Sequence, residues 1–215
     1  MTIISISDKV YPKLLAKIDK PPQKLFAEGD LNLLNQPAIT VVGSRNMTAY
    51  GQKVASFLVR DLVAAGQVII SGLARGVDAW AHETCLRNGG KTIAVLGHGL
   101  DQIYPPENRP LAEEIIKKGG LLLSEYPPKA SIRALNFKAR DRLMAGLTAG
   151  TLVIEGKSKS GTKITASYAV DFGREVFAVP GPIDSPNAIG PAELIQQGAK
   201  LVLTVEDILE ELPRG

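Results

Sequence analysis

The chain has 215 residues, 45% of them hydrophobic and 22% charged, which is the composition of one globular domain, or of a domain with a short appendage. The single cysteine, Cys85, excludes an internal disulfide, and with only two histidines we expect no metal site. Because no apolar stretch approaches the roughly 20 residues that cross a bilayer, and no signal segment follows Met1, we expect a cytoplasmic protein with no membrane partner.

Residues 1–38 differ from the rest of the chain. They hold prolines at positions 12, 21, 22 and 37 and only a weak helical pattern, over residues 11–18. We interpret them as an N-terminal extension packed on a core domain that spans residues 39–215.

Short apolar runs alternate with helical segments from residue 39 onward. The runs are continuous, as is typical of strands covered on both faces in a parallel sheet. Segments between them, such as residues 48–66 and 78–90, have helical spacing and end in glycine. This alternation predicts an α/β fold with an open, doubly wound sheet. The six predicted strands are residues 39–42, 68–71, 92–96, 121–125, 151–155 and 175–179.

A loop rich in proline and glycine follows the sixth predicted strand. It spans residues 180–190 and precedes a predicted helix, strand and acidic helix within residues 192–212. The chain therefore closes with one more strand for the sheet.

Glycines, hydroxyl side chains and cations follow several predicted strands. Glycines let backbone amides approach an anion closely, and helix N-termini add partial positive charge. The forked guanidinium of Arg45 suits phosphate oxygens. Since ligands of such sheets bind beyond the carboxyl ends of the strands, we expect a phosphate site there. The residues concerned are Gly43, Ser44, Arg45, Ser71, Gly72, Arg75, Ser160, Gly161, Thr162 and Lys163.

Structural alternatives exist for parts of this pattern. Glycines are common at strand-to-helix turns for backbone reasons alone. Arg75 and Asp78 could equally pair with each other across a turn, and Lys157 and Lys159 are expected to be solvated. For Arg45, at the mouth of the cleft, we favour a binding role.

The sequence indicates no catalytic residues and no cofactor. Asp78, Glu125 and Glu155 lie at strand exits, but nothing in their spacing pairs them as acid and base. We expect Cys85 to pack on the sheet and His98 to line the rim of the cleft. Neither a dinucleotide-binding glycine pattern nor a P-loop occurs in the chain.

Charge is unevenly distributed, although the net charge is only +3. Residues 193–215 carry five acids, whereas residues 129–142 carry five cations against Asp141 alone. On a helix, Lys138 and Arg142 share a face, Arg140 is offset, and Phe137 precedes the cluster. Cations beside an aromatic platform suit a single nucleic-acid strand, whereas the alternative is a solvated helix face with a core phenylalanine.

Taken together, these residues resemble the DNA-processing protein A family, also called Smf or DprA. The resemblance covers about residues 24–205 in order. It rests on "VVGSR…YG", "SGLARGVDAWAH", "GGKTIAVLGHGLDQIYPPENRPL", "LLLSEYPP", "NFKARDRLMAGL", "SGTKITASYAVDFGREVFAVPGPIDSP" and "LIQQGAKLV".

The resemblance implies an extended Rossmann-like fold, mostly parallel with helices on both faces, and no catalytic activity. It implies a homodimer that binds single-stranded DNA with little sequence preference, protects incoming DNA and loads the RecA recombinase during natural transformation. Arg140 and Arg142 would join the strand-end turns around the DNA pocket. For the dimer seam we expect residues 200–205, which could pair at a sheet edge.

The sequence departs from the family pattern at three positions. Lys138 stands in place of a proline, Asp141 in place of an asparagine between the two arginines, and Ala192 in place of an asparagine. Lys138 adds a positive charge to the basic cluster and Asp141 a negative one. Many family members carry further domains on both sides, so the sequence is similar to the core alone.

Two other functions share this broad fold. A nucleotide phosphoribohydrolase would need paired glycines and a glutamate where this chain has Thr165. A sensor of free nucleotides would use the same phosphate-binding turns, and the basic segment favours the polymer over that ligand.

Overall fold

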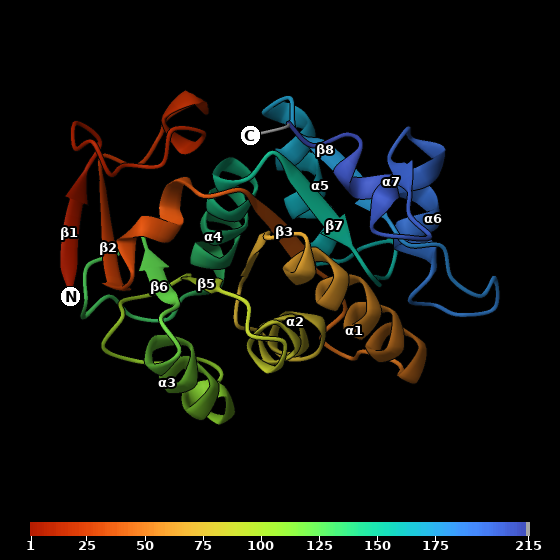
Figure 1. Cartoon of the computed structure of the whole chain (residues 1–215), viewed down its shortest axis with the longest axis horizontal. Helices are drawn as coiled ribbons and strands as arrows, with labels where there is room; N and C mark the ends of the chain where they lie inside the picture. The colour runs from red at the N-terminus through yellow and green to blue at the C-terminus, as the bar shows by residue number, and fades with distance from the viewer. Residues whose placement is uncertain (214–215) are drawn as a thin grey trace.

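The computed structural model describes residues 1–213, and within them nine strands form one sheet in the order β1-β2-β6-β5-β4-β3-β7-β8-β9 (Figure 1). All neighbours from β6 to β9 are parallel, whereas β1 and β2 are antiparallel. The strands are β1 (Thr2–Ser5), β2 (Lys24–Gly29), β3 (Ala38–Val42), β4 (Val68–Ser71), β5 (Thr92–Leu96), β6 (Leu121–Ser124), β7 (Gly150–Val153), β8 (Glu175–Ala178) and β9 (Lys200–Leu201).

Helices cover both faces of this sheet, which confirms the predicted fold class. Buried side chains of α1, α2, α3 and α7 pack on one face and those of α4, α5 and α6 on the other. The α-helices are α1 (Ala49–Ala64), α2 (Val77–Arg87), α3 (Arg109–Lys117), α4 (Ala134–Leu147), α5 (Gly161–Asp171), α6 (Ile189–Gln196) and α7 (Glu206–Leu209), with 3-10 turns η1 (Leu15–Lys17), η2 (Leu31–Asn35) and η3 (Pro106–Asn108).

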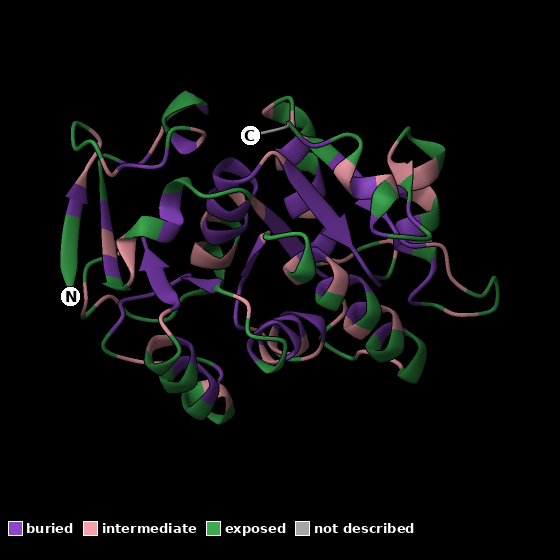
Figure 2. Ribbon diagram, in the orientation of Figure 1, coloured by how far each residue is buried: buried purple, intermediate pink, exposed green. Residues whose placement is uncertain are grey.

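The six predicted strands are β3 to β8, and their interior positions are buried on both faces (Figure 2). In β4, for example, Ile69 packs toward α1 while Ile70 packs toward α4. A strand between two helical layers buries side chains on both of its faces, which explains the mostly apolar, non-alternating runs.

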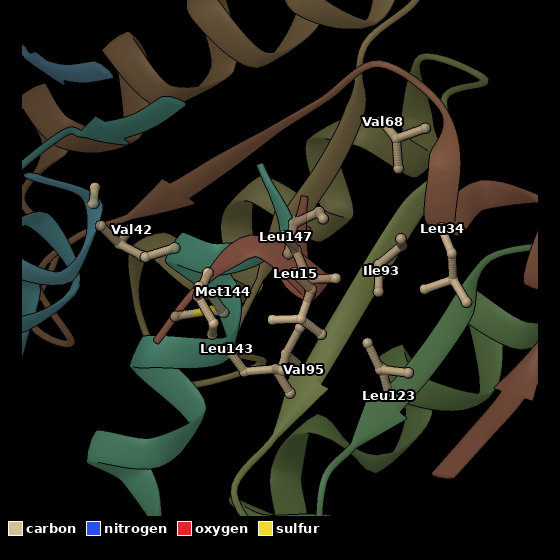
Figure 3. Close-up of a cluster of buried hydrophobic side chains, with 14 of the residues drawn as sticks. Leu15, Leu34, Val42, Val68, Ile93, Val95, Leu123, Leu143, Met144 and Leu147 are labelled. Carbon is tan, nitrogen blue, oxygen red and sulfur yellow. The ribbon is translucent and has the colours of Figure 1, made fainter. Parts of the chain in front are cut away.

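The N-terminal segment is part of this sheet and of its core. β2 pairs with β6, and β1 pairs with β2. Leu15 of η1 is fully buried in the same cluster as Leu143, Met144 and Leu147 of α4 (Figure 3). Burying a leucine side chain contributes about 1.5–3 kcal/mol, so η1 adds to the stability of the α4 face.

The strand order reverses between β3 and β7. β3 pairs with β4 on one side and with β7 on the other, and the chain winds outward from this point in both directions. Turns that leave the carboxyl ends of two such strands separate from each other and leave a crevice. Here those turns connect β3 to α1 and β7 to α5.

Candidate functional site

A cavity of about 410 Å³ opens beyond the carboxyl ends of β3 and β7. Its walls come from the turn after β3, the loop after β4, one side of α4, and the turn between β7 and α5. The lining residues are Val42, Gly43, Ser44, Arg45, Asn46, Ala74, Asp78, Phe137, Arg140, Asp141, Met144, Gly156, Lys157, Lys159, Ser160, Gly161, Thr162 and Thr165.

The turn after β3 is held from both ends. The Ser44 hydroxyl accepts a hydrogen bond from the amide of Asn46 at 3.1 Å. At the start of α1, the Glu155 carboxylate accepts hydrogen bonds from the Thr48 amide and hydroxyl at 2.9 and 2.5 Å. Glu155 is thus engaged in holding this helix, and the exposed Arg45 lies between the two anchored points at the cavity mouth.

The loop after β4 lies directly against this turn. The amide of Val77 donates to the carbonyl of Ser44 at 3.1 Å. Gly76 has φ of 73°, and a Cβ there would overlap the Ser44 oxygen, so only glycine permits this approach. The contact brings Asp78, at the start of α2, to the base of the cavity.

Arg140 of α4 forms the charged base of the cavity. Its side chain is only 5% exposed, with Nη1 3.3 Å from Asp78 Oδ2 and Nε 3.3 Å from Asp141 Oδ1. A Cβ on Gly72 would overlap Nη1, so Gly72 provides the space for the guanidinium. Within the described residues, Nε is buried without a hydrogen-bond partner. The charge at Nε is therefore met by the neighbouring Asp141 carboxylate without a hydrogen bond.

Phe137 lies close to two cations. Its ring centre is 6.0 Å from Arg45 Cζ and 5.8 Å from Arg140 Cζ, within the range of cation–π attraction. The Tyr104 ring lies 6.0 Å from the same centre. The half-buried phenylalanine therefore presents a flat surface inside a cationic site.

Burial changes the acidity of the two carboxyls at the base. It raises the pKa of Asp141 to about 6 and also raises the pKa of Asp78, although Arg140 opposes both shifts. The mouth carries Arg45, Lys157 and Lys159, for which we find no ion pair within residues 1–213. The cavity therefore combines one arginine and two carboxyls at its base with three cations at its mouth.

The N-terminus of α5 completes the anion-binding wall. Ser160 is its N-cap residue, but its side chain makes no capping hydrogen bond, and its Oγ is buried without a partner within residues 1–213. The first amides of an α-helix carry partial positive charge and lack internal acceptors. This wall thus offers donors that a phosphate can use.

The structure brings eight of the predicted site residues to the cavity and places six elsewhere. Lys138 and Lys163 line a neighbouring cavity, and Gly72 lies behind Arg140. The residues at the cavity are Gly43, Ser44, Arg45, Phe137, Arg140, Ser160, Gly161 and Thr162.

Ser71, Arg75 and Arg142 are engaged elsewhere. The buried Ser71 hydroxyl donates to the Val41 carbonyl at 2.7 Å, which ties β4 to β3. Arg75 forms an exposed ion pair with Glu107, so the alternative pairing with Asp78 is wrong. Arg142 forms an ion pair with Glu125 and donates a hydrogen bond to the Lys20 carbonyl of the N-terminal segment.

Both histidines are buried. The expectation that His98 lines the rim is wrong, because its side chain is 1% exposed and its Nδ1 lies 3.0 Å from the Gly99 carbonyl oxygen. His82 is hydrogen-bonded to Thr92, and burial lowers its pKa to about 3. Cys85 packs in the core as predicted, with burial raising its pKa to about 12.

Asn187 is a positioning residue that the sequence did not indicate. Its Nδ2 donates to the Asn46 carbonyl at 2.9 Å, and its own carbonyl accepts from the Gly156 amide at 2.7 Å. It thus connects the turns after β3 and β7 on opposite sides of the cavity. An asparagine in a loop rich in proline and glycine carries no sequence signal for this role.

Two kinds of feature are absent from residues 1–213. No group of three or more histidine, cysteine or acidic side chains is placed to hold a metal ion. No helix in that range has the length and apolar character to cross a membrane.

The sheet order and the cavity define an α/β protein with an anion-accepting crevice and an aromatic platform at its switch point. Comparison with known proteins is more specific: residues 2–213 match the family described as DNA recombination-mediator protein A. The chain belongs to this family, which is the resemblance that the sequence motifs indicated.

The DNA processing protein DprA of Bacillus subtilis is 47% identical over 211 residues, 98% of this chain and 71% of that protein. The X-ray structure of DprA from Streptococcus pneumoniae superimposes with a TM-score of 0.94 at 44% identity, covering 100% of this chain and 75% of that one. A structure of the Helicobacter pylori protein, reported for its unique single-stranded DNA binding mode, gives 0.87 at 30% identity, covering 98% and 97%. The chain spans 49% to 73% of the length of its curated relatives.

Proposed function

We propose that this chain binds single-stranded DNA in the cavity between β3 and β7. The observation that carries this proposal is the Phe137 ring with Arg45 and Arg140 at 6.0 and 5.8 Å, beside the open amides of α5. A strand needs cations for its phosphates and flat side chains for its unstacked bases, and this cavity supplies both.

The same arrangement supports binding with little sequence preference. Stacking on a phenylalanine ring depends on the face of a base, which every base has. Phosphate contacts from Arg45 and the α5 amides carry no sequence information. The similarity to the Helicobacter pylori protein, for which a single-stranded DNA binding mode is reported, supports the same ligand here.

We propose no catalytic step. The acids that line the cavity within residues 1–213 are Asp78 and Asp141, and both are ion-paired with Arg140. Both carboxylates are therefore engaged in holding Arg140.

On the basis of the family relationship, we also propose a role for this chain in the processing of incoming DNA. In it, a cytoplasmic homodimer would protect incoming DNA and load the RecA recombinase onto it during natural transformation. Residues 200–205 are our candidate for the dimer seam, because β9 (Lys200–Leu201) lies at an outer position of the sheet, where Leu201 and Leu203 are exposed.

The first test is a titration of fluorescent oligothymidylate at two salt concentrations. We expect tight binding that weakens with salt and exceeds the binding of a matching duplex. Arg45→Ala should weaken binding at least about tenfold and lower the salt slope by about 0.7, the value for one phosphate contact on a single strand. Arg109→Ala, an exposed arginine on α3, is the matched control.

The outcomes separate the polymer from a free nucleotide. Equal binding by the Arg45 and Arg109 variants would contradict the assignment of the cavity. Failure to bind any oligonucleotide, together with binding of a mononucleotide, would favour the nucleotide sensor.

A further inference from the structure

The cleft does not end at the first cavity. A second cavity of about 640 Å³ adjoins it, and both are lined by Lys159, Ser160 and Gly161. The second cavity lies between Lys138 of α4 and Tyr168 of α5. A chain molecule held in the first cavity can therefore continue over the N-terminal turn of α5 into the second.

The lining of the second cavity is cationic. Lys138, Lys159 and Lys163 line it, and no acidic residue does so within residues 1–213. The other polar side chains in the wall carry hydroxyls, and they are Ser158, Ser160, Ser167 and Tyr168. Ammonium and hydroxyl donors beside a helix N-terminus form a favourable environment for phosphate.

Glu193 of α6 holds two of these donors from behind the wall. Its carboxylate accepts from Lys163 Nζ at 2.7 Å and from Ser158 Oγ at 2.7 Å. These two hydrogen bonds lower the pKa of Glu193, so the carboxylate is ionised at neutral pH. It thus uses the same donors, through two oxygens, that a phosphodiester would use.

We infer that the second cavity is a subsite for a neighbouring phosphate of the same strand, and that Glu193 competes with this phosphate for Lys163 and Ser158. The inference rests on the proposed function, because it requires a polymer in the first cavity. It makes Glu193 a residue that limits affinity.

Replacing Glu193 by glutamine tests this competition. The variant keeps the size of the side chain and removes its charge, so Lys163 becomes available to phosphate. We expect Glu193→Gln to tighten binding of oligothymidylates of about 4 to 16 nucleotides by about fivefold. The salt slope should steepen by about 0.7. Binding of thymidine monophosphate, which fills the first cavity, should not change.

Two further variants make the test specific. Glu113→Gln removes one negative charge from the exposed face of α3 and should leave affinity unchanged. The gain of Glu193→Gln should disappear in Lys163→Gln/Glu193→Gln. The inference would be overturned if the Glu193→Gln and Glu113→Gln variants bound the strand equally well, or if Glu193→Gln bound thymidine monophosphate more tightly by the same factor. The proposed function would still stand in either case, provided that the wild type binds the strand. Absence of wild-type strand binding would reject both.

Discussion

The two sides of α4 use the same residue type for different purposes. Arg140 faces the cavity, where Asp78 and Asp141 hold it beneath Phe137. Arg142 lies on the other side, where its guanidinium donates to Glu125, which follows β6, at 3.0 Å and to the Lys20 carbonyl of the N-terminal segment at 2.7 Å. Residues two apart on a helix point in nearly opposite directions, so one basic cluster serves both a candidate binding site and the fold.

This difference corrects the expectation that both arginines surround the ligand. The Arg142 side chain is 20% exposed and Glu125 14%, so this ion pair is largely shielded from solvent. Both arginines have carboxylate partners, but Arg140 lines the cavity and Arg142 does not. The orientation of α4, which sequence spacing does not reveal, decides which arginine faces the cavity.

The largest effect is expected on the cavity side. Arg140→Met would leave Asp78 and Asp141 buried without a cation, which typically costs about 3–5 kcal/mol of stability. Urea unfolding at neutral pH measures this loss. It should shrink at about pH 5, because the raised pKa of Asp141, about 6, means that this carboxyl is then protonated and needs no cation. An equal loss at both pH values would contradict the buried-charge explanation.

A smaller loss is expected on the opposite side. Arg142→Met removes the pair with Glu125 and the hydrogen bond to Lys20, so we expect a stability loss of about 1–3 kcal/mol. Oligothymidylate affinity, measured where the variant is folded, should equal that of the wild type. A loss of affinity comparable to that of Arg45→Ala would show that Arg142 contacts the strand after all.

The smallest expected effect is a pH dependence of strand binding that arises from Asp141. The pKa of Asp141 is raised to about 6, so acidification from about pH 7.5 to 5.5 should protonate it and tighten strand binding about threefold. Asp141→Asn should bind at neutral pH as the wild type does in acid, and with little pH dependence. A wild-type affinity that is constant with pH would contradict this.

The charged and titratable groups around Asp141 support attributing the pH dependence of binding to this residue. Arg140 and Arg45 lower its pKa and Asp78 raises it, while burial is the largest effect. Burial lowers the pKa of His82 to about 3, so this histidine stays neutral in the range, and burial also lowers the pKa of His98. A residual pH dependence in Asp141→Asn would point to Asp78, whose pKa is raised, or to His98.

The central part of the fold was predictable from sequence because strands buried on both faces are continuous apolar runs. β1 was not, since it is paired on one side only and turns a single buried side chain, Ile4, toward the core. The predicted strand near residue 200 is present but short, with ladder pairs only at Lys200 and Leu201. Edge positions need less apolar sequence and so leave a weaker signal.

The candidate site was predictable where backbone position alone determines proximity. The turns at Gly43–Arg45 and Ser160–Thr162 follow neighbouring parallel strands, so they meet at one edge of the sheet. The pairing of Arg140 with Asp78 spans 62 residues and depends on how α4 rotates over the sheet. That rotation follows from the packing of Leu143 and Met144 in the core, which only the folded structure specifies.

The antiparallel strands β1 and β2 also cover the side of the sheet at β6 against strand addition by another chain. By pairing with β6, β2 converts a fully buried apolar strand from a sheet edge into an interior strand. Without residues 1–38, β6 would present unpaired amides and carbonyls along the sequence Leu-Leu-Leu-Ser, which is a template for strand addition by another chain. β1 takes over the outer position with only four residues, so another chain could form few hydrogen bonds with this edge.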